Sequence, residues 1–235
     1  MLNALSVLNT LLDKPARALL FDLDGTLVDS VPDLAAAIDA MLIDMGYKPA
    51  GEQRVRHWVG NGAVKLVQRA LTYAQQGDES TLLDENLQDW QSAHQCFLKH
   101  YGRLSPDFSC LYPGVIEAIT AWHQQGVAMA VVTNKPKQFV PEILQHFALD
   151  IFFPVIVGGD CLLQRKPSPE PLYFACEQLS VSANECIMIG DSKNDVGAAR
   201  AAGMSVACVS YGYNHGEPIE RAKPDIVVDS LMQLL

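Results

Sequence analysis

The chain has 235 residues, enough for one large domain or two smaller ones with a substantial hydrophobic core. With 49% apolar and 19% charged residues, the composition is that of a folded globular protein and excludes a disordered one. The formal net charge of -10 argues against a general affinity for nucleic acid or anionic membranes, although a local cation can still attract an anionic substrate.

The N-terminal stretch, MLNALSVLNTLLDK, is apolar but lacks the basic start of a secretory signal. Leu2, Leu5, Leu8 and Leu12 recur at helical spacing, which predicts a short amphipathic helix lying on the body of the protein or on a partner. No stretch of the sequence approaches the roughly 18 apolar residues of a membrane span. The six cysteines form no CxxC pair, so we expect reduced thiols in a cytoplasmic protein.

The first predicted strand, ARALLFDLD (residues 16–24), leads directly into two carboxylates, Asp22 and Asp24. Residues at i and i+2 of an extended segment point to the same side. Two like charges held this close are costly unless a cation or a shared proton lies between them. The stretch therefore predicts a bound cation or a shared proton.

Residues 31–107 contain no convincing strand. They carry three helix patterns instead, over residues 32–47, 63–76 and 82–102. Prolines punctuate the chain near both ends of this segment, which places hinges at 30–32 and 105–108. We expect residues 31–107 to form a helical cap domain inserted into a core of residues 1–30 and 108–235.

After the insert, short apolar runs alternate with helix patterns. The strand candidates are residues 127–134, 153–160, 185–192, 204–210 and 225–228, and the helix candidates are residues 114–125, 137–147, 170–179 and 195–202. This alternation predicts an α/β fold with a doubly wound parallel sheet covered on both faces. Ligands of such sheets bind at the carboxyl ends of the strands.

Polar residues stand at or follow several of these strand ends: Thr133, Asn134, Lys166, Asp191 and Asp195. Taken singly, each has an ordinary explanation. Thr133 could cap a helix, Lys166 could be a surface lysine, and Asp195 could be a helix N-terminal charge. Their occurrence together with Asp22 favours one functional site over separate structural roles.

Four motifs occur in order along essentially the whole chain. They are DxDGT at 22–26, an apolar run ending in Thr133, Lys-Pro at 166–167 and GDSxxD at 190–195. Together they resemble the haloacid dehalogenase superfamily of aspartate-nucleophile phosphotransferases. The resemblance implies a Rossmann-like core with an inserted helical cap. It also implies that Asp22 is the nucleophile and Asp24 the general acid, with Mg²⁺ held by the side chains of Asp22 and Asp191 and the backbone carbonyl of Asp24.

The resemblance implies roles for other residues as well. Thr133, the backbone amide of Asn134 and Lys166 would bind the transferred phosphoryl group, and Asp195 would orient Lys166. A tight turn at Gly25 and Thr26 allows their amides to face phosphate oxygens.

Several stretches are most similar to bacterial phosphoglycolate phosphatases, namely FDLDGTLVDS, HWVGNGA, VVTNKP, VIVGGD, RKPSPEPL, GDSKND and YGYNHGE. This similarity implies hydrolysis of a small phosphorylated metabolite, 2-phosphoglycolate, by a monomer or homodimer that binds neither nucleic acid nor membrane. The substrate carboxylate calls for a cationic or amide-rich cap loop. The candidates are Arg54, Asn61 and Gly62, with Arg56 and Lys65 beside them and Arg69 less suited.

Other functions stay open from the sequence. A broader phosphatase of sugar phosphates or nucleotides fits the same motifs, as does a β-phosphoglucomutase-like phosphotransferase. A non-catalytic binding protein on the same fold would have lost one of the motif residues, and none is lost. The loop at 60–65 could be only a glycine-rich helix start, and the loop at 211–217 has no role that the sequence defines.

Overall fold

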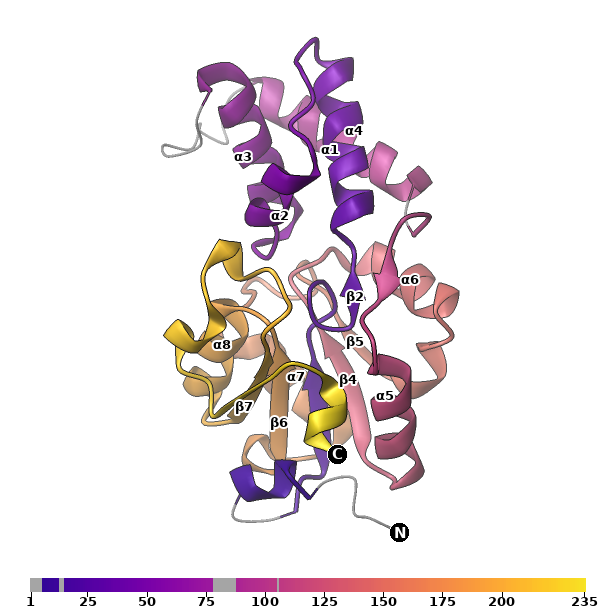
Figure 1. Cartoon of the computed structure of the whole chain (residues 1–235), viewed down its shortest axis with the longest axis vertical. Helices are drawn as coiled ribbons and strands as arrows, with labels where there is room; N and C mark the ends of the chain where they lie inside the picture. The colour runs from indigo at the N-terminus through magenta and orange to yellow at the C-terminus, as the bar shows by residue number, and fades with distance from the viewer. Residues whose placement is uncertain (1–5, 13–14, 78–87, 105) are drawn as a thin grey trace.

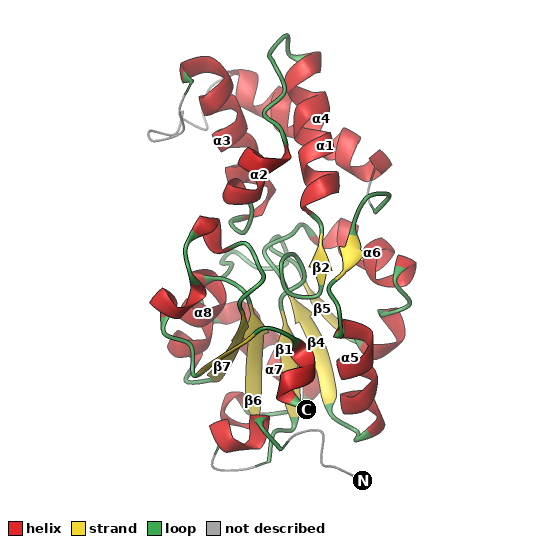
Figure 2. Cartoon of the chain, in the orientation of Figure 1, coloured by secondary structure: helices red, strands yellow, loops and turns green. Residues whose placement is uncertain are grey.

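A six-stranded parallel sheet, in the order β5-β4-β1-β6-β7-β8, forms the core of the computed structural model, which describes residues 6–12, 15–77, 88–104 and 106–235 (Figures 1 and 2). Its strands are β1 (Ala18–Phe21), β4 (Ala128–Val132), β5 (Val155–Val157), β6 (Cys186–Gly190), β7 (Ser205–Val209) and β8 (Ile226–Val228). Each lies within, or coincides with, a run predicted as a strand. The predicted fold class is confirmed.

Alternating side chains of these strands enter two separate apolar layers, because successive residues of a strand face opposite sides. Leu19 and Phe21 of β1 pack with helix α5 (Val115–Gln124) and helix α6 (Val140–His146). Ala18 and Leu20 pack on the other side with helices α7 (Glu170–Leu179) and α8 (Lys193–Ala202). Burial on both faces explains why β1 reads as a continuous apolar run.

Four helices stand beyond the carboxyl ends of the strands as a separate layer (Figure 1). They are α1 (Val31–Asp44), α2 (Glu52–Trp58), α3 (Gly62–Gln76) and α4 (Gln88–Leu104). Helix α1 packs against each of the other three. The predicted helical cap is confirmed, whereas its boundaries at residues 31 and 107 stay a prediction, and residues 82–87 of the predicted third helix lie outside the described residues.

A two-stranded antiparallel ribbon joins the two layers. Strand β2 (Val28–Asp29) pairs with β3 (Cys110–Leu111), and together they flank the predicted hinges. Asp33 accepts hydrogen bonds from the Phe108 amide and the Ser109 hydroxyl, so the two crossing segments are tied together. Neither this ribbon nor helix α2 was predicted.

The N-terminal segment differs from the prediction. Over residues 6–12 the chain forms only one short 3₁₀ turn, Leu8–Leu11, instead of an amphipathic α-helix, and Leu2 and Leu5 lie outside the described residues. Leu8 is fully buried, and the Ser205 hydroxyl donates to the carbonyl of Leu11 at 2.8 Å. The segment therefore packs on the core sheet domain. No helix in the described ranges has both the length and the apolar character to cross a membrane.

Candidate active site

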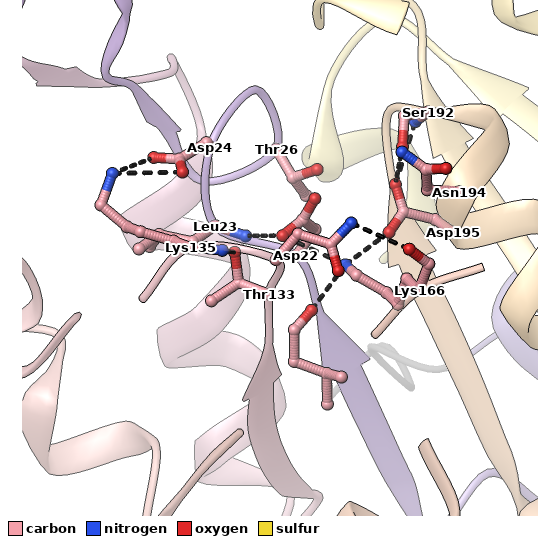
Figure 3. Close-up of polar contacts among 12 residues, drawn as sticks. Asp22, Leu23, Asp24, Thr26, Thr133, Lys135, Lys166, Ser192, Asn194 and Asp195 are labelled. Carbon is pink, nitrogen blue, oxygen red and sulfur yellow. Dashed lines mark hydrogen bonds and ion pairs between the residues drawn. The ribbon is translucent and has the colours of Figure 1, made fainter. Parts of the chain in front are cut away.

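The three central strands, β4, β1 and β6, bring the predicted site residues together because their carboxyl ends lie side by side. Asp22 follows β1, Thr133 follows β4 and Asp191 follows β6. Lys166 and Asp195 reach the same place from the loop before α7 and from the first turn of α8 (Figure 3).

Lys166 lies between two carboxylates. Its Nζ is 3.1 Å from Asp22 Oδ1 and 2.6 Å from Asp195 Oδ1, and it also donates to the carbonyl of Val132 at 2.6 Å. Burial alone would lower the pKa of this lysine, but Asp195 and Asp22 outweigh burial and the pKa is raised. Lys166 is therefore a fixed positive charge beside Asp22.

Asp195 is a positioning residue for this lysine. Its second oxygen, Oδ2, accepts hydrogen bonds from the Ser192 amide at 3.0 Å and the Ser192 hydroxyl at 2.7 Å. The bond from the Ser192 amide belongs to a capping box at the start of α8, in which the Ser192 side chain accepts in turn from the Asp195 amide. Both carboxylate oxygens are thus engaged, which holds the oxygen that faces Lys166 in one place.

Asp22 is a buried carboxylate at the end of the central strand. Its Oδ1 accepts a hydrogen bond from the Leu23 amide at 2.7 Å. The pKa of Asp22 is raised to about 6, chiefly by burial; Lys166 acts in the opposite direction, and the charges of Asp195 and Asp24 contribute to the rise. A cation near Asp22 would remove this penalty on its charged form.

The acidic cluster fits a divalent metal ion. Carboxylate oxygens of Asp22, Asp191 and Asp195 lie within 4.8 Å of one another, and all three residues are buried. Burial raises the pKa of Asp191 well above its usual value, and the charges of Asp195 and Asp22 add to the effect. Oxygen donors suit a hard divalent cation, and Asp22 and Asp191, which follow the neighbouring strands β1 and β6, would supply them.

Asp24 points away from this cluster, although it lies only two residues from Asp22 (Figure 3). Its two oxygens are 2.9 and 3.1 Å from Lys135 Nζ, and Oδ1 also accepts from the Ser30 hydroxyl at 2.6 Å. Lys135 has only 4% of its surface exposed and was not predicted. The sequence feature that could have identified Lys135 is its position two residues beyond Thr133, at the end of a buried strand.

The turn after β1 supports Asp191, and its two amides donate hydrogen bonds within the turn. The Gly25 amide donates to the Val28 carbonyl and the Thr26 amide to the Leu23 carbonyl, while the Thr26 hydroxyl donates to Asp191 Oδ1 at 3.0 Å. Gly25 has a φ of 89°, and a Cβ there would lie 2.4 Å from Asp191 Oδ2. Glycine is therefore required both by the backbone and by the space that Asp191 occupies.

A cavity opens over Asp22 between the core and the helical cap. Asp24, Thr133, Asn134 and Lys135 line its core side, and the remaining lining residues are Leu34, Val59, Gly60, Gly62, Ala63, Leu66, Phe97, Tyr101, Pro136 and Phe139. The prediction that cap residue Gly62 faces the site is thus consistent with the structure.

The other predicted cap residues are not among those that line this cavity. Arg54 donates to the Ala50 carbonyl at 2.8 Å and stacks over the ring of Tyr73 at 4.0 Å, beside a different surface pocket. Asn61 accepts from Arg69 Nη2 at 2.9 Å and lines an opening next to Lys166. Sequence periodicity does not define which way such side chains point, and a substrate-binding role for these two residues stays a prediction.

Two asparagine amides tie the cap loop to the core. Asn134 Nδ2 and Asn194 Nδ2 both donate to the carbonyl of Gly60, at 3.1 and 3.0 Å. The Asn134 amide also donates to the Lys166 carbonyl at 3.0 Å. The same residues that surround the site therefore hold the cap loop over it.

The loop at 211–217, whose role the sequence left undefined, supports both the acidic cluster and the hinge. The amide of Tyr213 donates to Asp191 Oδ2 at 2.8 Å, and its hydroxyl donates to Asp29 Oδ1 at 2.8 Å. Gly212 lies so close to Asp191 that a Cβ there would be 2.1 Å from the aspartate Cβ. Asp191 is therefore held by two segments that lie far apart in the sequence, the turn at Gly25 and the loop at 211–217.

Comparisons with known proteins agree with this arrangement. Residues 19–209 match the family model described as haloacid dehalogenase-like hydrolase. A phosphoglycolate phosphatase of Pseudomonas fluorescens (strain Pf0-1) is 47% identical over 219 residues, covering 93% of this chain and 78% of the relative. One from Vibrio parahaemolyticus is 45% identical over 219 residues, covering 93% and 94%.

Solved structures show the same likeness. The crystal structure of a predicted phosphoglycolate phosphatase from Haemophilus somnus superposes with a TM-score of 0.86 at 39% identity, covering 94% of this chain and 97% of that one. The family match spans both the sheet and the inserted cap. The chain belongs to the haloacid dehalogenase-like hydrolase family, with phosphoglycolate phosphatases among its relatives.

Proposed function

We propose that the protein is a Mg²⁺-dependent phosphatase that hydrolyses 2-phosphoglycolate to glycolate and phosphate through an aspartyl-phosphate intermediate. The observation that carries the proposal is the placement of Asp22, a buried carboxylate with Lys166 Nζ at 3.1 Å and Asp191 in the same cluster. The names of relatives at 44–47% identity support the choice of substrate.

Asp22 would act as the nucleophile. A carboxylate oxygen of Asp22 forms a bond to phosphorus while the ester P–O bond breaks, so one difficult displacement becomes two easier ones. Lys166, the hydroxyl of Thr133 and the backbone amide of Asn134 would stabilise the charge on the oxygens of the transferred phosphoryl group. Such positioning and neutralisation supply most of the catalysis in phosphoryl transfer.

Asp24 would move the protons. In the first step it gives a proton to the departing glycolate oxygen, and in the second it takes one from the water that attacks phosphorus and releases Asp22. Its ion pair with Lys135 holds the carboxylate in one place. The pair also orients Asp24 toward the cavity side of the site.

Mg²⁺ would be held by the carboxylates of Asp22 and Asp191 and, from the family resemblance, by the backbone carbonyl of Asp24. When bound it supplies charge neutralisation for the nucleophile and the phosphate. Asp195 would keep Lys166 and the rest of the cluster in position.

The position of the cap supports a small substrate. The described helices of the proposed cap domain (residues 31–107) line, together with the core, a largely apolar cavity over the nucleophile. Large partners such as nucleic acid or membrane would not reach Asp22 through it. We further propose a cytoplasmic monomer or homodimer, a compartment consistent with six free cysteines.

Phosphate release tests this proposal. Wild-type protein with Mg²⁺ is assayed on 2-phosphoglycolate, glucose 6-phosphate, a nucleoside monophosphate and p-nitrophenyl phosphate, with and without a chelator. We expect kcat/KM for 2-phosphoglycolate to lead by about a hundredfold, or roughly 2.7 kcal/mol of transition-state discrimination.

The control is Asp22→Asn, which should abolish turnover of every substrate. If activity is equal across the panel and disappears in Asp22→Asn, the proposed substrate is wrong and the protein is a general phosphatase. Activity that persists in Asp22→Asn would contradict the chemistry itself.

A further inference from the structure

Lys135 provides a positive charge in a cavity wall that is otherwise mostly apolar. Among the described residues that line the cavity over Asp22, Lys135 is the only cationic one. Its apolar neighbours there include Leu34, Leu66, Phe97 and Phe139. A carboxylate entering such a cavity loses water and needs a cation to offset that cost.

The two buried lysines of the site face different groups. Lys166 is engaged by Asp22 and Asp195, on the side of the nucleophile. Lys135 lies 2.9 and 3.1 Å from the two oxygens of Asp24, on the side where the proposed general acid must meet the departing oxygen. In 2-phosphoglycolate the carboxylate carbon is only two bonds from that oxygen. A leaving group in reach of Asp24 therefore places its carboxylate beside Lys135.

The ammonium of Lys135 is suited to a second carboxylate. Its Nζ is buried and forms an ion pair with Asp24. A lysine carries three N–H donors, so the ammonium can bridge Asp24, whose oxygens lie at 2.9 and 3.1 Å, and a second carboxylate.

The cap contributes to the same corner. The ring of Tyr101, on α4, lies 4.6 Å from Lys135 Nζ and fixes the ammonium by a cation–π contact. Gly62 and Ala63, the first residues of α3, line the same cavity, so the positive end of that helix adds to the field. A carboxylate at this place meets the lysine of the core and the helix start of the cap together.

We propose that Lys135 binds the carboxylate of 2-phosphoglycolate and is the residue that distinguishes this substrate from phosphate esters without a carboxylate. The inference rests on the proposed function and assigns its substrate preference to a core lysine instead of the cap residues Arg54 and Asn61.

The test compares 2-phosphoglycolate with carbamoylmethyl phosphate, which replaces the carboxylate by a neutral amide of similar shape. The variants are Lys135→Met, Lys135→Gln as a second neutral variant, and Lys135→Arg, which keeps the charge. Lys137→Met is the matched control, because Lys137 is an exposed lysine of the same segment that does not line the cavity. Circular dichroism confirms that each variant is folded.

Wild type and Lys137→Met should prefer the carboxylate substrate. In Lys135→Met we expect kcat/KM for 2-phosphoglycolate to fall about a hundredfold, chiefly through KM, because the substrate charge is left without its partner. Turnover of the amide substrate should also fall, but less, since that substrate loses only the positioning of Asp24 by Lys135 and makes no contact with the ammonium itself. Lys135→Arg should recover most of the preference.

Three results would overturn the inference in distinguishable ways. If the wild-type protein has the same kcat/KM on 2-phosphoglycolate and on the amide, both the proposed substrate and this inference are wrong. If the wild-type protein prefers the carboxylate substrate and Lys135→Met or Lys135→Gln keeps that preference unchanged, only the proposed role of Lys135 is wrong. Equal losses on both substrates in all three Lys135 variants would show that Lys135 acts structurally.

Discussion

Asp22 and Asp191 are buried carboxylates whose charged forms are unfavourable without a neighbouring cation. Burial raises the pKa of Asp22 to about 6, against the opposing effect of Lys166, and the pKa of Asp191 is raised well above its usual value by burial, Asp195 and Asp22. Metal binding requires the deprotonated forms, so protons and the cation compete for the same oxygens. The competition weakens as the pH rises through the raised pKa values.

The Mg²⁺ requirement should therefore depend on pH. As the pH falls from 6 to 5, we expect the Mg²⁺ concentration for half-maximal activity to rise by about tenfold or more. Titrations of Mg²⁺ at saturating 2-phosphoglycolate between pH 5 and 8 measure this, with circular dichroism at each pH to show that the protein is folded. A half-maximal Mg²⁺ concentration that stays constant over this range would contradict the assignment of Asp22 and Asp191 as metal ligands.

At the scale of elements, the contact between the cap loop and the core centres on one carbonyl. Gly60, between α2 and α3, accepts hydrogen bonds from Asn134 after β4 and from Asn194 in the first turn of α8. Gly60 has a φ of 116°, which favours glycine at the position that presents this carbonyl. Two core elements thus hold the loop that closes the site.

Removing one of these donors should loosen the cap. We expect Asn194→Ala to lose about 1 kcal/mol of cap–core stabilisation, equivalent to roughly a fivefold fall in kcat/KM for 2-phosphoglycolate. Steady-state kinetics measure the effect. The matched control is Asn184→Ala, an exposed asparagine at the other end of β6, which should behave as wild type. Equal kinetics in Asn194→Ala and wild type would mean that this bond does not hold the cap closed.

At the scale of the whole molecule, the sequence predicts what depends on burial pattern and motif order. The four inner strands are buried almost throughout and the edge strands β5 and β8 in part, so all six read as apolar runs. The positions of Asp22, Thr133 and Asp191 follow from parallel strands ending at one edge. The ribbon of β2 and β3 has two residues in each strand, too few to form a pattern. Helix α2 has seven residues, which is less than two full periods of a helix.

What the sequence could not define are contacts between distant residues. Lys135 pairs with Asp24 across 111 positions, and nothing local to either residue indicates the other. Arg54 is a plausible anion ligand by type, but its guanidinium stacks on Tyr73 within the cap. The motif residues were predictable as a group, whereas the residues that face the leaving group required the three-dimensional arrangement.

The most direct test of the account is to find where the phosphoryl group goes. Wild-type protein is mixed with a stoichiometric amount of 2-phosphoglycolate and Mg²⁺, quenched rapidly in acid and analysed by peptide mass spectrometry, with Asp22→Asn treated in the same way. The account predicts a transient phosphate on the peptide that contains Asp22, at that residue, and none in Asp22→Asn, which releases no glycolate. A phosphate found on a different side chain, or turnover by Asp22→Asn at the wild-type rate, would contradict it.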